Sequence, residues 1–361
     1  MSDVRYWLGF NLVSGIGPSG IRALLRHFGG LEPAWKANAA TLRAIGLRRD
    51  GIEQLVSKRS QIDLDAELAT VKDHGLQILT WDDDDYPSLL RSIDHPPPLL
   101  YVRGNIVPDD GFAVAVVGTR KCTDYGVRVT RRLTGGLTAN GITIVSGLAL
   151  GIDGMAHRAA LDAGGRTLAV FGCGLDTIYP ARHRDLAERI AQSGALISDY
   201  PLGTAPEATN FPPRNRIISG LSLGTLVTEA GIKSGALITA RFALDQGRET
   251  FAVPGNIYSR SSAGANALIQ RGEAKLVTRV EDILEELNLT MVPQQKEVRT
   301  IVPDTPTERV LLGYMGEEPV PLDDIVRDSG LPTATVSSTL CMMELKGMVR
   351  RVDSMSYVLA H

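Results

Sequence analysis

Short apolar runs that end in glycine, small polar residues or arginine recur through the middle of the chain, between Phe112 and Gly255. With their ends they read AVAVVGTR, ITIVSGLALGID, TLAVFGCGLD, FPPRNRIISG, TLVTEAGIKSGALITA and FAVPGN. Runs of this composition are typical of parallel strands that are buried on both faces. Because segments of helical length separate the runs, the pattern predicts an α/β fold with a doubly wound, Rossmann-like parallel sheet.

The elements of this sheet are expected to follow one another as repeated strand and helix units. We expect strands at 112–117, 142–146, 167–171, 195–198, 225–229 and 250–253. We expect helices at 125–139, 152–163, 182–193, around 213–219, 235–246 and 264–271. An open parallel sheet binds its ligand beyond the carboxyl ends of its strands, so the polar clusters mark the expected site.

The flanking segments predict further modules, with boundaries at 1–78, 79–289, 290–306 and 307–361. The first is expected to be a SAM-like or helix-hairpin-helix-like module, with helices at 4–12, 19–28, 32–37, 40–45, 49–57 and 64–74. The acidic, proline-rich stretch from Trp81 to Asn105 is expected to be an extended connector. Residues 290–306 read as a linker, and 307–361 as the helices and hairpin of a winged-helix domain.

Composition excludes several classes of protein. The formal net charge of −3 over 361 residues gives no general attraction to nucleic acid, so a polyanion would need a local patch. The first residues lack the basic start and apolar core of a signal peptide, and no apolar run is long enough to span a membrane. We therefore expect a cytoplasmic protein without membrane attachment.

Few residues of the middle segment suggest catalysis or metal binding. Cys122, Cys173 and Cys341 lie far apart without the spacing of a zinc site, and no metal is expected. Asp153 and His157 lie four residues apart on one helix, where an acidic first turn and a packing histidine are favoured over a catalytic pair.

The first strand ends in Gly118, Thr119 and Arg120. The segment GTRKCTDYG lacks the GxGxxG of dinucleotide-binding folds, so we expect neither NAD nor FAD nor any other cofactor. Arg120 suits a bidentate phosphate contact, although a capping or salt-bridging arginine is an alternative. After the next strand, Ser146 and Gly147 are expected to direct backbone N–H groups at an anion.

The segment from Phe211 to Arg216 brings an aromatic ring, two guanidinium groups and an amide to the start of a helix. Arg214 and Arg216 match phosphate oxygens, Asn215 can hydrogen-bond a base or sugar, and Phe211 offers a stacking face. Such a combination favours single-stranded nucleic acid. An arginine pair that solvates a helix start is the alternative.

The cluster Lys233, Ser234 and Gly235 again joins a strand to a helix and adds a cation to backbone donors. Asn256 ends the last of these runs. Glu229 is the one carboxylate of the crevice that suggests chemistry, but we favour an orienting role beside Arg214 or Arg216.

In order along the chain, the motifs VGTR, SGLALGIDGMAH, FGCGLDTIYP, LISDYPLG, FPPRNRIISGLS, TEAGIKSGALITA and FAVPGN resemble the DNA-processing protein A family (DprA, also called Smf). The resemblance covers about 180 residues of the chain's middle. It implies a bacterial protein without enzymatic activity that binds single-stranded DNA and forms a homodimer through its Rossmann-like domain. It also implies that such a protein loads the RecA recombinase onto strands covered by single-strand binding protein, chiefly in natural transformation.

The sequence and the resemblance together predict one positive groove for single-stranded DNA, bound with strong salt dependence and little sequence preference. The residues expected to form it are Gly118, Thr119, Arg120, Ser146, Gly147, Phe211, Arg214, Asn215, Arg216, Lys233, Ser234, Gly235 and Asn256. The rival hypothesis is a nucleoside-monophosphate phosphoribohydrolase of the lysine-decarboxylase-like type, with Glu229 and Arg216 at the N-glycosidic bond. A further alternative is an adaptor that acts through its C-terminal tail.

Overall fold

The computed structural model describes residues 3–289, 305–315, 320–345, 349–351 and 356–359. Contacts within the chain divide it into two units, Met1–Leu287 and Asn288–His361. Residues 290–304 of the expected linker lie outside the described residues.

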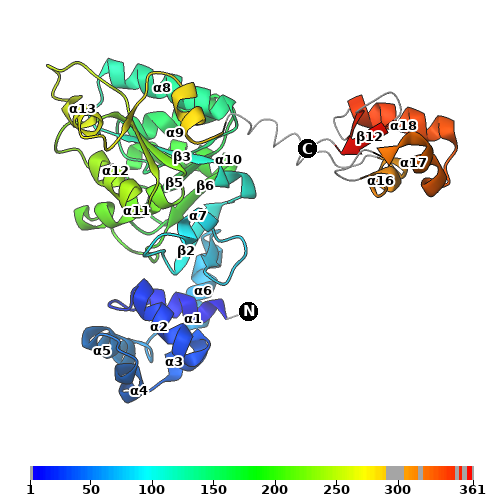
Figure 1. Cartoon of the computed structure of the whole chain (residues 1–361). Coiled ribbons are helices and arrows are strands. Elements are labelled where there is room, and N and C mark those ends of the chain that lie inside the picture. The colour runs from blue at the N-terminus through cyan, green and yellow to red at the C-terminus, as the bar shows by residue number, and fades with distance from the viewer. Residues whose placement is uncertain (1–2, 290–304, 316–319, 346–348, 352–355, 360–361) are drawn as a thin grey trace. The chain divides into compact units, whose positions relative to one another are not determined.

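The N-terminal region is helical, as the sequence predicts (Figure 1). Its helices are α1 (Val4–Leu12), α2 (Pro18–Phe28), α3 (Leu31–Lys36), α4 (Ala39–Ala44), α5 (Arg49–Lys58) and α6 (Leu64–Asp73). Side-chain caps explain several starts, because Asp3 accepts from Arg5 N ahead of α1 and Asp63 accepts from Ala66 N ahead of α6. A left-handed glycine, Gly29, ends α2.

The sheet of the first unit has the strand order β1-β2-β6-β5-β4-β3-β7-β8-β9. Its strands are β1 (Gln77–Thr80), β2 (Leu99–Gly104), β3 (Ala113–Gly118), β4 (Thr143–Ser146), β5 (Thr167–Val170), β6 (Ala195–Ser198), β7 (Gly224–Glu229), β8 (Glu249–Ala252) and β9 (Lys275–Leu276). Strands β3 to β9 pair in parallel, and almost every residue of β3 to β8 is buried. The predicted parallel core is therefore confirmed.

The proline-rich stretch is not the irregular connector that the sequence predicts. It contributes β2, which pairs antiparallel with β6, and β1 pairs antiparallel with β2 at the sheet's edge. The short helix α7 (Ser88–Arg91) lies between them. The prolines at 96–98 end just where β2 begins, so no ladder hydrogen bond needs their missing N–H groups.

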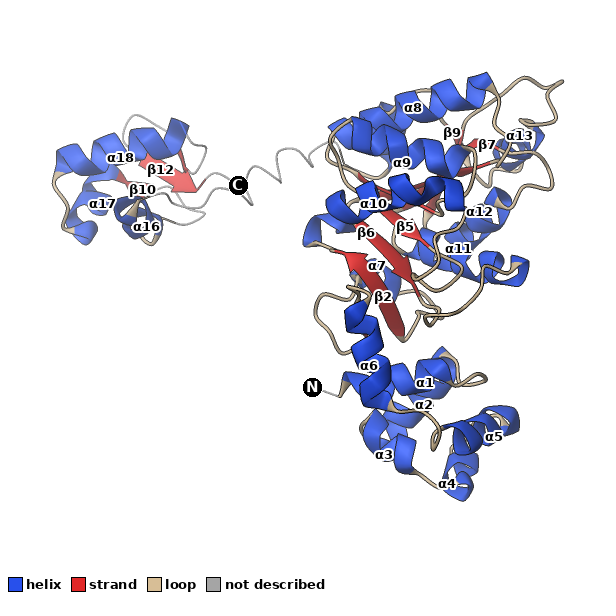
Figure 2. Ribbon diagram, turned by 180° about the vertical axis from the view of Figure 1, so that it is seen from behind, coloured by secondary structure: helices blue, strands red, loops and turns tan. Residues whose placement is uncertain are grey.

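Helices connect the parallel strands and cover both faces of the sheet (Figure 2). They are α8 (Asp124–Ala139), α9 (Ile152–Asp162), α10 (Arg184–Ser193), α11 (Phe211–Gly220), α12 (Ala236–Asp245), α13 (Ala263–Gln270) and α14 (Glu281–Glu286). Connections from β3 run through β4 and β5 to β6, and the chain then returns across β3 to β7. Right-handed crossovers place α8 to α10 on one face and α11 to α13 on the other. The order thus reverses between β3 and β7, where such folds bind ligands.

The N-terminal helices pack as part of the first unit. Trp7 and Phe10 belong to the same buried apolar cluster as Tyr101 of β2 and Leu196 of β6. Asn11 of α1 also donates to the carbonyl of Asp199 over 3.1 Å. The predicted boundary after residue 78 falls within β1.

The second unit is a winged-helix domain with its own core. It contains α16 (Pro306–Leu312), β10 (Val320–Pro321), α17 (Leu322–Ser329), α18 (Thr333–Leu345), β11 (Val349–Arg351) and β12 (Ser356–Leu359). Strand β12 lies between β10 and β11 in an antiparallel sheet. Apolar residues from all three helices, including Leu311, Ile325 and Leu340, form the core.

Candidate functional site

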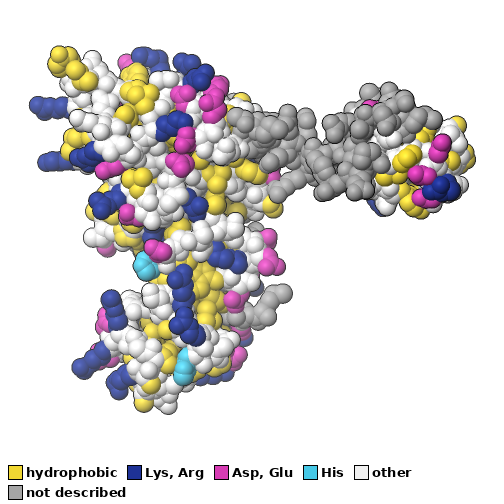
Figure 3. All heavy atoms as spheres, viewed as in Figure 1, with side chains coloured by type: hydrophobic (Ala, Val, Ile, Leu, Met, Phe, Trp, Pro, Cys, Tyr) yellow, Lys and Arg dark blue, Asp and Glu magenta, His cyan; other side chains and the backbone are white. Residues whose placement is uncertain are grey.

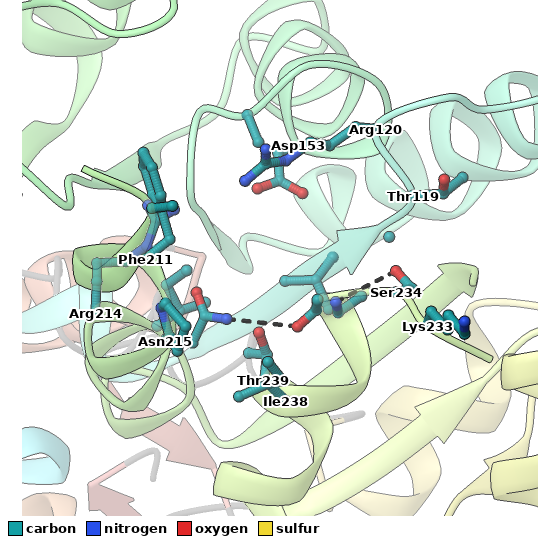
Figure 4. A pocket seen from close by; sticks show the side chains of 18 of the residues that line it. Thr119, Arg120, Asp153, Phe211, Arg214, Asn215, Lys233, Ser234, Ile238 and Thr239 are labelled. Carbon is teal, nitrogen blue, oxygen red and sulfur yellow. Dashed lines mark hydrogen bonds between the residues drawn. The ribbon is translucent and has the colours of Figure 1, made fainter. Parts of the chain in front are cut away.

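A cavity of about 610 Å³ opens where the strand order reverses (Figure 4). The segments after β3, β4, β5, β6 and β7 and the first turns of α11 and α12 form its walls. The lining residues are Val117, Gly118, Thr119, Arg120, Ala149, Asp153, Tyr179, Pro206, Ala208, Phe211, Pro212, Arg214, Asn215, Ile218, Lys233, Ser234, Gly235, Ala236, Ile238 and Thr239.

Close backbone packing fixes the turns that carry these residues. A Cβ on Gly118 would lie 2.5 Å from Ile152 Cγ1, and a Cβ on Gly151 would lie 2.3 Å from the carbonyl of Thr119. Gly151 also has a φ of +78°, which favours glycine. Ile152 N donates to Thr119 O over 3.2 Å, and Thr119 N donates to Glu229 O over 2.7 Å. These hydrogen bonds and close contacts hold the segments that follow β3, β4 and β7 against one another.

Aromatic rings and a cation gather on one side of the cavity. Phe211 lies 5.7 Å from Tyr179, ring centre to ring centre, and the Cζ of Arg120 lies 5.5 Å from the Phe211 ring. Arg120 is exposed, and Tyr179 keeps 44% of its surface accessible. Sequence reasoning missed Tyr179, although its place in the cluster after β5 was a usable signal. The exposed Tyr179 ring and the half-buried Phe211 ring, beside a guanidinium, offer stacking faces for flat groups.

Arg214 lies beneath the Phe211 ring rather than in the open. It is only 4% exposed, its Cζ lies 5.7 Å from the Phe211 ring, and its Nη1 donates to the carbonyls of Gly147 (2.9 Å) and Val170. Burial lowers the pKa of Arg214 to about 10, so the guanidinium stays charged at neutral pH. Its Nε is buried without a partner among the described residues. Arg214 therefore gives the cavity floor a fixed positive charge.

Neither Ser146 nor Gly147 lines the cavity, which corrects the sequence prediction for both. Ser146 is fully buried and its hydroxyl donates to Val116 O over 2.6 Å. Gly147 N donates to Asp153 Oδ2 over 3.2 Å. A Cβ on Gly147 would lie 2.6 Å from Arg214 Nη1, so glycine is required because the guanidinium packs against it.

Asp153 and His157 have the packing roles that the sequence favours. Burial raises the pKa of the Asp153 carboxyl, and the nearby Arg214 opposes this shift. His157 is fully buried, and its Nδ1 lies 2.7 Å from Thr167 Oγ1. Burial lowers the pKa of His157 to about 3, so its ring is neutral at physiological pH.

Arg216 does not line the cavity, contrary to the sequence prediction. Its Nη2 lies 2.8 Å from Asp199 Oδ2, its Nη1 donates to His95 O, and both partners of the ion pair are less than 20% exposed. Residues two apart on a helix do not share a face, so α11 directs Arg214 and Arg216 to different surroundings. Arg216 joins α11 to the end of β6 and to the segment before β2.

Glu229 orients neither Arg214 nor Arg216, which corrects another prediction. Its carboxylate accepts from Thr123 N over 2.9 Å and from Thr123 Oγ1 over 2.7 Å, ahead of α8. Glu229 lines a separate cavity of about 490 Å³, and Asn256 lies there too. Asn256 is thus outside the cavity that holds Arg120.

Lys233, Ser234, Gly235 and Asn215 all reach the main cavity. Figure 4 shows Lys233 on the side opposite Phe211. Lys233 is exposed and makes no ion pair with any described residue. Asn215 Nδ2 donates to Gly235 O over 3.5 Å, and Ala236 N donates to Ser234 Oγ over 3.3 Å. The first turn of α12 therefore faces the cavity beside a lysine, which suits an anion.

The positive charge of the cavity is local. On the face shown in Figure 3, Lys and Arg side chains are interspersed with Asp and Glu side chains. Where the structure describes the chain, no group of three or more His, Cys, Asp or Glu is placed to hold a metal ion. Among the described helices, none has the length and apolar character needed to cross a membrane.

Comparison with known proteins agrees with this architecture. A family model described as DNA recombination-mediator protein A matches residues 77–288. The chain belongs to this family. A second model, the DprA winged helix domain, matches residues 295–354. Protein Smf of Synechocystis sp. is 38% identical, over 99% of this chain and 98% of that protein.

Solved structures of the family share the fold. The chain is similar to the X-ray structure of DNA processing protein A from Streptococcus pneumoniae, with a TM-score of 0.70, 38% identity, and coverage of 79% of this chain and 99% of that one. It is also similar to DNA processing protein A from Helicobacter pylori, with a TM-score of 0.53, 32% identity, and coverage of 59% and 96%. The Helicobacter pylori protein is described as having a unique single-stranded DNA binding mode.

Proposed function

We propose that this protein binds single-stranded DNA in the cavity between β3 and β7, as a step in DNA processing. The observation that carries the proposal is the arrangement of Arg120, Phe211 and Tyr179 on one side of the cavity and Lys233 on the other. Aromatic rings that line a cavity can stack on bases of any sequence, and cations on either side attract the phosphates.

The cavity suits an unpaired strand better than a duplex. Phe211 and Tyr179 line a recess, so a base must leave its stack to reach them. The buried charge of Arg214 adds attraction for a phosphate without direct exposure. The relative from Helicobacter pylori, which is described as binding single-stranded DNA, has the same fold at 32% identity.

We further propose that the protein acts without catalysis in the cytoplasm, as a homodimer through its Rossmann-like unit. Its proposed task is to load RecA onto strands covered by single-strand binding protein, in natural transformation or homologous recombination. Membership of a recombination-mediator family supports this task. The remaining residues proposed to contact DNA are Gly118, Thr119, Asn215, Ser234 and Gly235, which line the same cavity.

The phosphoribohydrolase hypothesis has weaker support. It needs Glu229 and Arg216 together at one N-glycosidic bond, but neither residue lines the main cavity. The Glu229 carboxylate is held by Thr123, and the Arg216 guanidinium is paired with Asp199. Both groups are therefore committed to structural contacts.

Fluorescence anisotropy with a labelled oligonucleotide tests the proposal. We expect the single strand to bind much more tightly than the duplex of the same sequence at equal salt, with an affinity that depends only weakly on sequence. Equal affinity for the two forms would contradict it. As a parallel assay, incubation with adenosine monophosphate should release no adenine, and release would favour the rival.

A further inference from the structure

The loop formed by residues 255–262 exposes large side chains near the turn that carries Lys233 of the main cavity. Ile257 is 81% exposed and Tyr258 is 90% exposed, and Arg260 is also exposed. No described residue forms an ion pair with Arg260. Figures 1 and 2 show the segment after β8 projecting from the sheet beside α13.

Hydrogen bonds hold this loop in a defined shape. At its base, Asn266 binds both backbone groups of Gly255, with Gly255 N to Oδ1 and Nδ2 to Gly255 O each 3.0 Å. At its tip, Tyr258 N donates to Asn256 Oδ1 over 2.9 Å, and Ser259 N donates to Asn256 O over 2.9 Å. Asn256, which is outside the cavity, therefore positions Tyr258. A ring presented on a shaped loop loses little conformational entropy when it stacks.

The loop packs against the turn that carries Lys233. A Cβ on Gly231 would lie 3.0 Å from Arg260 O, and Gly264 N donates to Ala230 O over 2.7 Å. Between Gly231 and Lys233, Ile232 is 61% exposed. Lys233 lines the cavity, so the chain leads from that side of the cavity through the exposed Ile232 to Gly231, which lies against the backbone of Arg260.

We propose that single-stranded DNA leaving the cavity at Lys233 continues over the 255–262 loop, where a base stacks on Tyr258 and a phosphate pairs with Arg260. This inference rests on the proposed function. An aromatic ring beside a cation is the combination that binds unpaired strands. Phe211 and Arg120 supply the same two residue types inside the cavity, where the Cζ of Arg120 lies 5.5 Å from the Phe211 ring.

The proposal is tested with a length series of labelled oligothymidylates at fixed salt. Wild-type affinity should rise with length, first as the cavity fills and again when the strand reaches the loop. Tyr258→Ala should leave the shortest binding oligonucleotide unaffected and weaken the long ones about fivefold, or about 1 kcal/mol. Tyr258→Phe keeps the ring and should retain the wild-type values, and Arg260→Ala should weaken only the long oligonucleotides.

Arg120→Ala separates this proposal from the proposed function, because it should weaken binding at every length. If wild-type protein binds no oligonucleotide of any length, the proposed function itself fails. If Arg120→Ala binds DNA more weakly while Tyr258→Ala and Arg260→Ala bind long strands as wild type does, the assignment of the cavity is supported and the proposed path over the loop is wrong. Sedimentation of Tyr258→Ala tests the alternative that a second copy of the chain covers this loop. If Tyr258→Ala no longer self-associates but binds DNA as wild type does, the loop is a contact between copies and the proposal is overturned.

Discussion

Replacing Gly147 by alanine tests how the cavity floor is built. The added Cβ would lie 2.6 Å from Nη1, 2.7 Å from Nη2 and 2.8 Å from Cζ of Arg214, whereas ordinary contact begins at 3.4 Å. The guanidinium must therefore move by about 0.8 Å. Such a shift strains its 2.9 Å hydrogen bond to Gly147 O and its contact with the Phe211 ring.

Two effects set the size of the destabilisation. Overpacking of a tight interior costs about 1–3 kcal/mol. A hydrogen bond from a charged group contributes about 1.5–3 kcal/mol. The two costs do not add in full, because a movement of Arg214 that relieves the overpacking also weakens its hydrogen bond. We therefore expect Gly147→Ala to lower the free energy of unfolding by about 2–4 kcal/mol. Affinity for single-stranded DNA should also fall, because the shift of the guanidinium displaces the Phe211 ring that packs on it.

Urea unfolding followed by circular dichroism, together with anisotropy, measures both effects. Gly135→Ala is the matched control, because Gly135 lies within α8 and nothing surrounds the added Cβ within 4 Å. Alanine there should stabilise the protein by about 0.5–1 kcal/mol, since glycine is the poorer helix former. Equal urea midpoints for Gly147→Ala and wild type would refute the role given to Gly147.

Three further changes have defined outcomes. Arg216→Ala should destabilise the fold by about 1–3 kcal/mol, because the half-buried Asp199 loses its partner. Urea unfolding should show this, while the salt dependence of DNA binding stays unchanged. The pKa of His157 is about 3 in the folded protein and 6.5 in the unfolded chain, so between these pH values only the unfolded chain binds the proton. The free energy of unfolding should therefore fall by about 2 kcal/mol from pH 7 to pH 5. His157→Gln should remove that part of the pH dependence. Tyr179→Ala should weaken DNA binding by about 1–3 kcal/mol while Tyr179→Phe does not, as measured by anisotropy.

The strand-end clusters made the core of the fold and the place of the candidate cavity predictable. Buried apolar runs with regular spacing fixed the order of strands and helices, and parallel strands must bring their carboxyl ends to one edge. Arg120, Phe211 and Lys233 therefore meet although they are far apart in sequence.

The antiparallel edge was harder to predict. The run LLYVRG has the composition of a strand, but the acidic and proline-rich residues before it favoured an irregular segment. Tertiary packing decided the outcome, because Tyr101 and its neighbours are buried against the N-terminal helices.

Which of the two arginines lies at the cavity depends on contacts that no local pattern contains. Arg214 and Arg216 look equivalent in FPPRNR, yet one lies under Phe211 and the other pairs with Asp199. Only their spacing on a helix was a clue that they point apart. The glycine at position 147 was equally hard to explain from the sequence, because the group that excludes a side chain there is Arg214, which is distant in sequence.

The salt dependence of single-stranded DNA binding by Arg120→Ala tests the central claim most directly. Because each phosphate contact on a single strand contributes about 0.7 to the slope of log affinity against log salt, losing Arg120 should reduce that slope by about 0.7 and weaken binding. Arg189→Ala, which removes an exposed arginine paired with Asp162, should leave slope and affinity as in wild type. Wild-type slope and affinity in Arg120→Ala would contradict the assignment of the cavity as the DNA site.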